Sequence, residues 1–211
     1  MPSRAMKIFE GWTLVYLTGA VMLGWFIVNF AVTGGTSEGQ LDFIRYGVRP
    51  TLVLFALAFT ASSLVKLWPN AFTRWQIKNR RYLGVSFATA HLLHFGAIVV
   101  WALLLPEPFM TQPPLAIWIG GLSGYLFIIA MLITSFNAPA RAIGGRAWRL
   151  LHKVGIYYVW FLFTLALTLR SIADSFYYPF AAFMWALLLI RICANFARKR
   201  STEATASAAK A

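Results

Sequence analysis

The chain has 211 residues, of which 60% are hydrophobic and only 12% are charged, and its formal net charge is +13. A soluble domain is nearer half apolar and a quarter charged, so this composition excludes an ordinary soluble protein. Several apolar runs reach the roughly 20 residues that are needed to cross a bilayer core of about 30 Å. The sequence therefore predicts an all-α polytopic membrane protein, with residues 1–211 forming a single transmembrane domain.

Six transmembrane helices are expected, separated by prolines or polar loops. The glycine-rich stretch Thr33–Arg49 is expected to be a loop, and Pro50 to begin the second helix. The basic stretches Asn70–Arg81 and Asn137–Arg149 are also expected to lie between helices. The GxxxG spacing of Gly120–Gly124 predicts close helix packing within the bundle. The expected helices span about residues 12–32, 50–68, 82–105, 115–136, 150–170 and 176–196.

The distribution of basic residues predicts the topology. Sixteen of the nineteen lysines and arginines fall on one side of the expected bundle. Fourteen are in the N-terminus, the loops around residues 74–81 and 141–153 and the C-terminal tail, and Lys66 and Arg191 lie near the adjoining helix ends. The positive-inside rule then places both termini in the cytoplasm. Membrane topology and contact with anionic lipid explain the basic excess, so no nucleic-acid partner is expected. The first apolar run is too long for a secretory signal and is expected to be retained, whereas the polar tail Ala197–Ala211 is expected to be disordered.

All three histidines lie in apolar runs, where an imidazole is costly and marks a candidate functional site. His91 and His94 share a face of one expected helix, and His152 lies about one turn inside another helix that runs in the same direction. Two ligands on opposite faces of a porphyrin cannot both come from one helical turn. His152 is therefore expected to hold a haem iron together with either His91 or His94. Arg80 and Arg81 are the basic residues expected to neutralise the haem propionates.

Two other interpretations of the histidines stay open at this point. The same three side chains could bind zinc or copper, although no acidic or thiol ligand lies near them in the sequence. In a protein of a different class, a non-redox scaffold or a small transporter, each imidazole would instead hydrogen-bond a neighbouring helix. A visible spectrum would separate a haem protein from such a protein.

Several motifs resemble those of the ferric reductase-like transmembrane domain. The layout is most similar to the haem-binding membrane subunit of bacterial periplasmic methionine-sulfoxide reductase systems. The matching residues are the pair Arg80–Arg81, Gly84, His94, the pair Thr134–Ser135, Trp148 and the pair Leu151–His152. The resemblance covers most of the chain and implies a six-helix, cytochrome b-like bundle with His94 and His152 as haem ligands. One position departs from the family, because Leu165 stands where a second histidine of the fifth helix is usual.

The resemblance also implies a role in electron transfer across a bacterial inner membrane. One haem b per chain would pass electrons to a separate periplasmic reductase subunit. Quinol or a cytosolic flavin reductase would be the donor, so that any quinone or FMN would belong to a partner. The sequence contains no nucleotide-binding or hydrolytic motif, and the chain is therefore expected to be an electron-transfer subunit rather than a self-sufficient enzyme.

Overall fold

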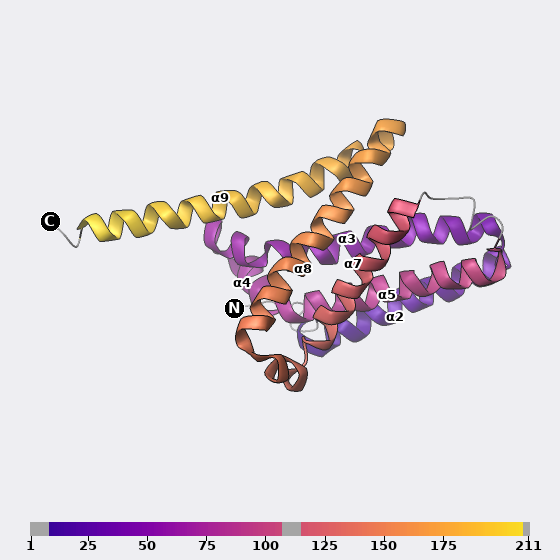
Figure 1. Cartoon of the computed structure of the whole chain (residues 1–211), viewed down its shortest axis with the longest axis horizontal. Coiled ribbons are helices and arrows are strands. Elements are labelled where there is room, and N and C mark those ends of the chain that lie inside the picture. Colours follow the sequence, from indigo (N-terminus) through magenta and orange to yellow (C-terminus); the bar gives the residue numbers. More distant parts are fainter. Residues whose placement is uncertain (1–8, 107–114, 209–211) are drawn as a thin grey trace.

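The computed structural model describes residues 9–106 and 115–208. Every regular element in this part of the chain is a helix, which confirms the expected all-α class (Figure 1). The helices are α2 (Gly11–Thr33), α3 (Ser37–Leu67), α4 (Ala71–Lys78), α5 (Arg80–Leu104), α7 (Leu115–Ile133), α8 (Asn137–Ala173), the short 3-10 helix η1 (Ser175–Tyr177) and α9 (Tyr178–Ala208).

Five stretches of the described helices are long and apolar enough to cross a membrane. They are α2, Phe43–Leu67 of α3, α5, α8 and Ser175–Ala197 at the start of α9. Within the described residues α7 adds a shorter apolar helix, Ile119–Ile133. Large apolar side chains such as Val21 and Ile172 are well exposed on these helices, as contact with lipid requires. The chain is a multi-pass membrane protein, and six complete spans remain a prediction.

The first half of α3 differs from the sequence expectation, which placed a loop before Pro50. The helix begins after Thr36, whose side chain accepts a hydrogen bond from the backbone N–H of Gly39, and Pro50 lies inside it. A proline inside a helix removes one backbone hydrogen bond. Phe43 is nevertheless fully buried, with its ring centroid 5.2 Å from that of Phe26 in α2. This tertiary contact stabilises helical turns that the local sequence does not favour.

The two basic segments expected between helices also differ from the prediction, because both are largely helical. Residues 71–78 form α4, which Asn70 and Thr73 begin with a reciprocal capping box. Residues 137–149 form the first part of α8. Gly144 interrupts this helix with φ of 77° and ψ of 155°, a backbone conformation that is essentially restricted to glycine.

The C-terminal tail, expected to be disordered from Ala197 onward, differs as well. Helix α9 continues to Ala208, and only residues 209–211 of the tail lie outside the described residues. The stretch contains several alanines, arginines and a lysine but neither glycine nor proline, and such residues favour helix. A helix that already exists over the preceding turns is extended at little cost by residues of this kind.

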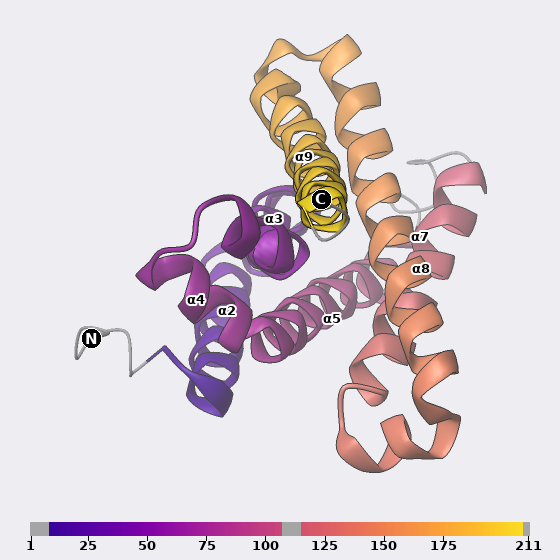
Figure 2. The same ribbon diagram turned by 90° about the vertical axis from the view of Figure 1, so that its left-hand side faces the viewer.

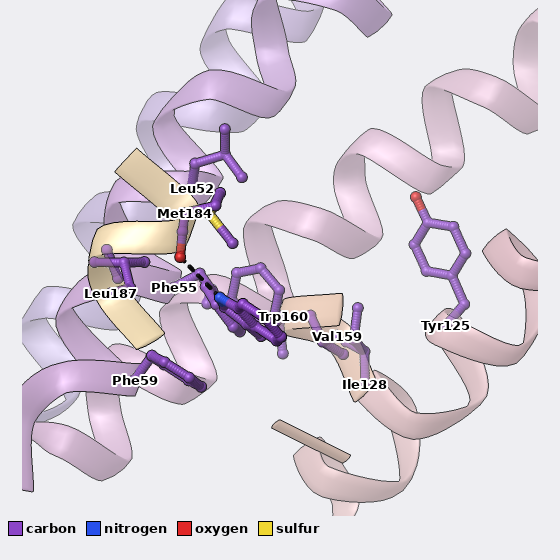
Figure 3. Packing of buried hydrophobic residues seen from close by; sticks show 12 residues of the cluster. Leu52, Phe55, Phe59, Tyr125, Ile128, Val159, Trp160, Met184 and Leu187 are labelled. Atoms are coloured by element: carbon purple, nitrogen blue, oxygen red, sulfur yellow. Dashed lines mark hydrogen bonds between the residues drawn. The ribbon is translucent and has the colours of Figure 1, made fainter. Parts of the chain in front are cut away.

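Helices α2, α3 and α5 lie side by side, while α7 and α8 form a neighbouring pair that crosses α5 obliquely (Figures 1 and 2). The chain turns back at η1, and α9 then packs against both α8 and α3. The hydrophobic core lies where these helices meet (Figure 3). At its centre the indole Nε1 of Trp160 donates a hydrogen bond of 2.9 Å to the backbone oxygen of Met184, which joins α8 to α9.

Candidate functional site

His91 and His94 lie together near the middle of α5, and both side chains are buried. Their ring centroids are 5.3 Å apart, with 23° between the ring planes. Within the described part of the chain, the Nδ1 atoms of both rings have no hydrogen-bond partner. An unpaired buried polar group costs about 1–3 kcal/mol. The two adjacent imidazoles are therefore a candidate ligand site, because the surrounding protein groups do not hydrogen-bond their Nδ1 atoms.

Aromatic side chains from three helices enclose His91. Phe87 of α5 stacks on it with 5.5 Å between ring centroids, and Tyr125 of α7 does so at 5.1 Å. Phe163 of α8 meets the imidazole edge-on at 5.3 Å, with 83° between the planes. Buried polar groups among apolar and aromatic side chains are typical of the residues that line cofactor sites.

Ser86 is a further buried polar residue of α5 that the sequence reasoning missed. Its Oγ has no hydrogen-bond partner among the described residues, and its side chain is fully buried. Three buried, unpartnered polar groups thus lie within nine residues of one helix, Ser86 to His94. The signal that could have found Ser86 is a serine within two turns of two histidines in an apolar run.

His152 lies in a different part of the bundle, where α7 ends and α8 begins. Its Nε2 is 3.0 Å from the hydroxyl oxygen of Thr134, and its ring centroid is 4.5 Å from that of Trp148. The indole Nε1 of Trp148 donates a hydrogen bond of 2.9 Å to the backbone oxygen of Thr134. The structure therefore brings together three residues of the sequence motifs, and their network ties the end of α7 to α8.

The structure does not bring His152 to the α5 pair. His152 and Phe163, which contacts His91, are eleven residues apart on α8, or about three turns and 16 Å along one face of the helix. Two imidazoles that share one metal ion hold their ligating nitrogens about 4 Å apart, since each metal–nitrogen bond is about 2 Å. In this arrangement the ligating nitrogens of His152 and of the α5 pair are roughly 10 Å or more apart. That separation is too large for the expected shared haem iron between α5 and α8.

Arg80 and Arg81 begin α5, about 16 Å along the helix from His91. The guanidinium of Arg81 donates a hydrogen bond of 3.2 Å from Nη1 to the side-chain oxygen of Asn137, at the start of α8. Arg80 lies within electrostatic range of His152. The arginine pair is therefore at the same end of the bundle as His152, and not beside the α5 histidines.

Arg191 is a second residue whose role the sequence reasoning missed, although it falls within the expected helix 176–196. It is half-buried between helices and donates hydrogen bonds of 2.7 Å to the backbone oxygen of Phe59 and of 3.1 Å to the hydroxyl of Tyr157. Its guanidinium also lies over both rings, 4.4 Å and 4.6 Å from their centroids. The signal was a single charge in the apolar run LLLIRICANF, where a charged residue needs a partner.

No group of three or more histidine, cysteine, aspartate or glutamate side chains that could hold a metal ion occurs in the part of the chain that the structure describes. The three histidines are accordingly not gathered into one zinc or copper site.

Comparisons with known proteins relate the chain to two kinds of protein. It is 30% identical over 145 residues to the magnetosome protein MamZ of Magnetospirillum gryphiswaldense, a match over 66% of this chain and 22% of MamZ. It is 27% identical over 147 residues to the protein-methionine-sulfoxide reductase heme-binding subunit MsrQ of Ralstonia nicotianae, over 55% of this chain and 61% of that protein. To MsrQ of Herminiimonas arsenicoxydans it is 24% identical over 153 residues, over 63% of this chain and 64% of that protein.

The chain thus spans about a fifth of the MamZ sequence and less than two thirds of either MsrQ sequence. No protein-family model and no solved structure matches the chain. The similarity to MsrQ agrees with the resemblance seen in the motifs, whereas membership of the wider ferric reductase-like group remains a proposal.

Proposed function

We propose that this chain is a haem b-binding membrane subunit of an oxidoreductase, related to MsrQ within the ferric reductase-like group. It would pass electrons across a bacterial inner membrane to a separate reductase, of which a periplasmic methionine-sulfoxide reductase is the proposed example. The observation that carries this proposal is the α5 pair, in which two buried imidazoles have unpartnered Nδ1 atoms inside an apolar helix.

The α5 pair fits a haem group, which would supply one-electron transfer when bound. His91 or His94 would ligate the iron, and the other imidazole would lie beside the group and orient it. Phe87, Tyr125 and Phe163 would exclude water from the ligand. His152 does not fit as a second ligand of the same iron in this arrangement.

The arginine pair, the topology and the electron donor are further parts of the proposal. Arg80 and Arg81 lie about 16 Å along α5 from His91, and they would interact with propionates that extend toward that end of the helix. Both termini would lie in the cytoplasm, and residues 1–211 would act as a single transmembrane domain. Quinol or a cytosolic flavin reductase would be the electron donor, with quinone or FMN bound by the partner rather than by this chain.

A visible spectrum of the purified full-length chain tests the proposal. We expect a Soret band, and split α and β bands after reduction with dithionite. A pyridine haemochrome assay should then give about one haem b per chain, since the α5 pair is the only place where two of the three histidines meet. A preparation without haem absorbance, obtained from cells that make haem, would contradict the proposed function.

One observation favours the second candidate, a non-redox scaffold or small transporter. The contact of His152 with Thr134 is the kind of inter-helix hydrogen bond that such a protein would make with its histidines. The α5 histidines make no such contact through Nδ1 among the described residues, which is why the haem-binding function is preferred.

A further inference from the structure

We propose that one histidine of the α5 pair is the only histidine ligand of the haem iron, and that His152 is a structural residue of the α7–α8 junction. This inference rests on the proposed haem-binding function. A haem held between α5 and α8 by two histidines would need a histidine on α8 at the depth of His91. The chain has only three histidines, so none is left to occupy that depth.

The residues that face the α5 pair at its own depth are not histidines. Phe163 of α8 and Tyr125 of α7 contact His91 directly. Leu165, two residues beyond Phe163, lies on nearly the opposite face of α8 and has 42% of its surface exposed, so it does not face α5. The α8 residue that contacts the α5 pair is therefore a phenylalanine, which cannot ligate iron.

Close contacts along α7 and α8 fix the position of His152. A Cβ added to Gly124 would lie 2.7 Å from Leu162, and one added to Gly155 would lie 2.8 Å from the sulfur of Met131. Ser123 and Tyr158 share a hydrogen bond of 2.7 Å between their hydroxyl groups. These contacts pair the two helices in an antiparallel register. A slide of α8 alone by three turns would break all of them. A slide of α7 and α8 together along α5 would instead break the contacts of Tyr125 and Phe163 with His91.

The hydrogen bonding of His152 also opposes ligation through Nε2. Thr134 donates its only hydroxyl hydrogen to the backbone oxygen of Ala130 at 2.7 Å. The same hydroxyl oxygen lies 3.0 Å from Nε2 of His152. Ligation of a metal ion through Nε2 would therefore require this contact between α7 and α8 to be broken.

The test compares three matched variants of the full-length chain, His91→Gln, His94→Gln and His152→Gln. Glutamine keeps a side chain that can hydrogen-bond Thr134 but is a poor haem ligand, and His152→Ala serves as the harsher second variant. We expect His152→Gln to keep the haem content and the spin state of the wild-type protein, by absorbance and electron paramagnetic resonance. We expect one of the two α5 variants to lose most of its haem, at least tenfold.

Each result decides between the alternatives. A folded His152→Gln or His152→Ala protein that loses its haem, or whose iron changes spin state, would overturn the inference while leaving the haem function in place. Retention of haem in both α5 variants would overturn it too. A wild-type protein that binds no haem at all would contradict the proposed function itself, and that result is seen before any variant is made.

Discussion

Arg191 carries a charge into the interior of the bundle, and its surroundings explain how this is tolerated. Two hydrogen bonds and two ring faces, from Phe59 of α3 and Tyr157 of α8, take the place of the water that the guanidinium loses. Hydrogen bonds to charged groups contribute about 1.5–3 kcal/mol, and a cation–π contact contributes about 0.5–2 kcal/mol. One side chain of α9 thereby joins three helices.

We expect Arg191→Met to lower the stability of the protein in detergent by about 1–3 kcal/mol, since it removes these contacts while keeping an unbranched apolar chain. Arg191→Lys is the matched control. It retains the charge but not the planar fork that reaches two acceptors, so its loss should be intermediate. Thermal unfolding followed by circular dichroism measures both. A methionine variant as stable as wild type would show that the free energy of desolvating the guanidinium equals the stabilisation that its contacts provide.

At the scale of the element, the pairing of α7 with α8 determines where their functional side chains lie. Gly120 and Gly124 both face Leu162, where an added Cβ would lie 3.5 Å and 2.7 Å from its methyl carbons. The predicted role of the GxxxG spacing, close packing within the bundle, is therefore confirmed. This contact and the Gly155–Met131 contact place Thr134 of α7 against His152 of α8.

Gly124→Ile should force α7 and α8 apart and destabilise the protein by about 1–3 kcal/mol, the usual cost of overpacking. Gly121→Ile is the matched control, because it adds the same residue three positions earlier in α7, where an added Cβ meets nothing within 4 Å. Thermal unfolding of both variants gives the comparison. If the two variants were equally stable, the close approach of the helices at Gly124 would not be a source of stability.

At the scale of the whole molecule, contacts between α5 and α8 give the relative direction of these two helices, which the sequence had predicted. Arg81 of α5 contacts Asn137 at the start of α8, and His91 further along α5 contacts Phe163 further along α8. The two helices therefore run in the same sense, although they cross obliquely (Figure 2). Helix α7 runs antiparallel to α8, so the chain reverses direction twice between α5 and α8 and returns to the same sense.

The orientation of these helices in the membrane is a prediction from charge. A reporter fused after Ala211 should be active as a cytoplasmic fusion, and one inserted near Glu107 should behave as periplasmic, because basic residues remain on the cytoplasmic side. Paired alkaline phosphatase and green fluorescent protein fusions at each position provide the measurement and its control. The reverse pattern would invert the proposed direction of electron transfer.

Much of the fold could be predicted from the sequence, because apolar runs of bilayer length and the prolines and polar residues between them are local features. The positions of α2, α5 and α7 were predicted to within a few residues. The first half of α3 was not, because its helix depends on the burial of Phe43 against Phe26 of α2, which local composition does not show. Helix α4 and the start of α8 were also missed, although the capping box of Asn70 and Thr73 is a local signal for α4.

The sequence by itself determined that the chain crosses a membrane as helices, that its histidines lie inside apolar helices, and that His91 and His94 share a face. Only the tertiary structure decided that His152 lies about three turns from the depth of His91 and contacts Thr134 instead. The helical period specifies which side chains share a face within one helix. The relative depth of two helices is set by packing between residues far apart in the chain, here Phe163 of α8 against His91 and Phe87 of α5.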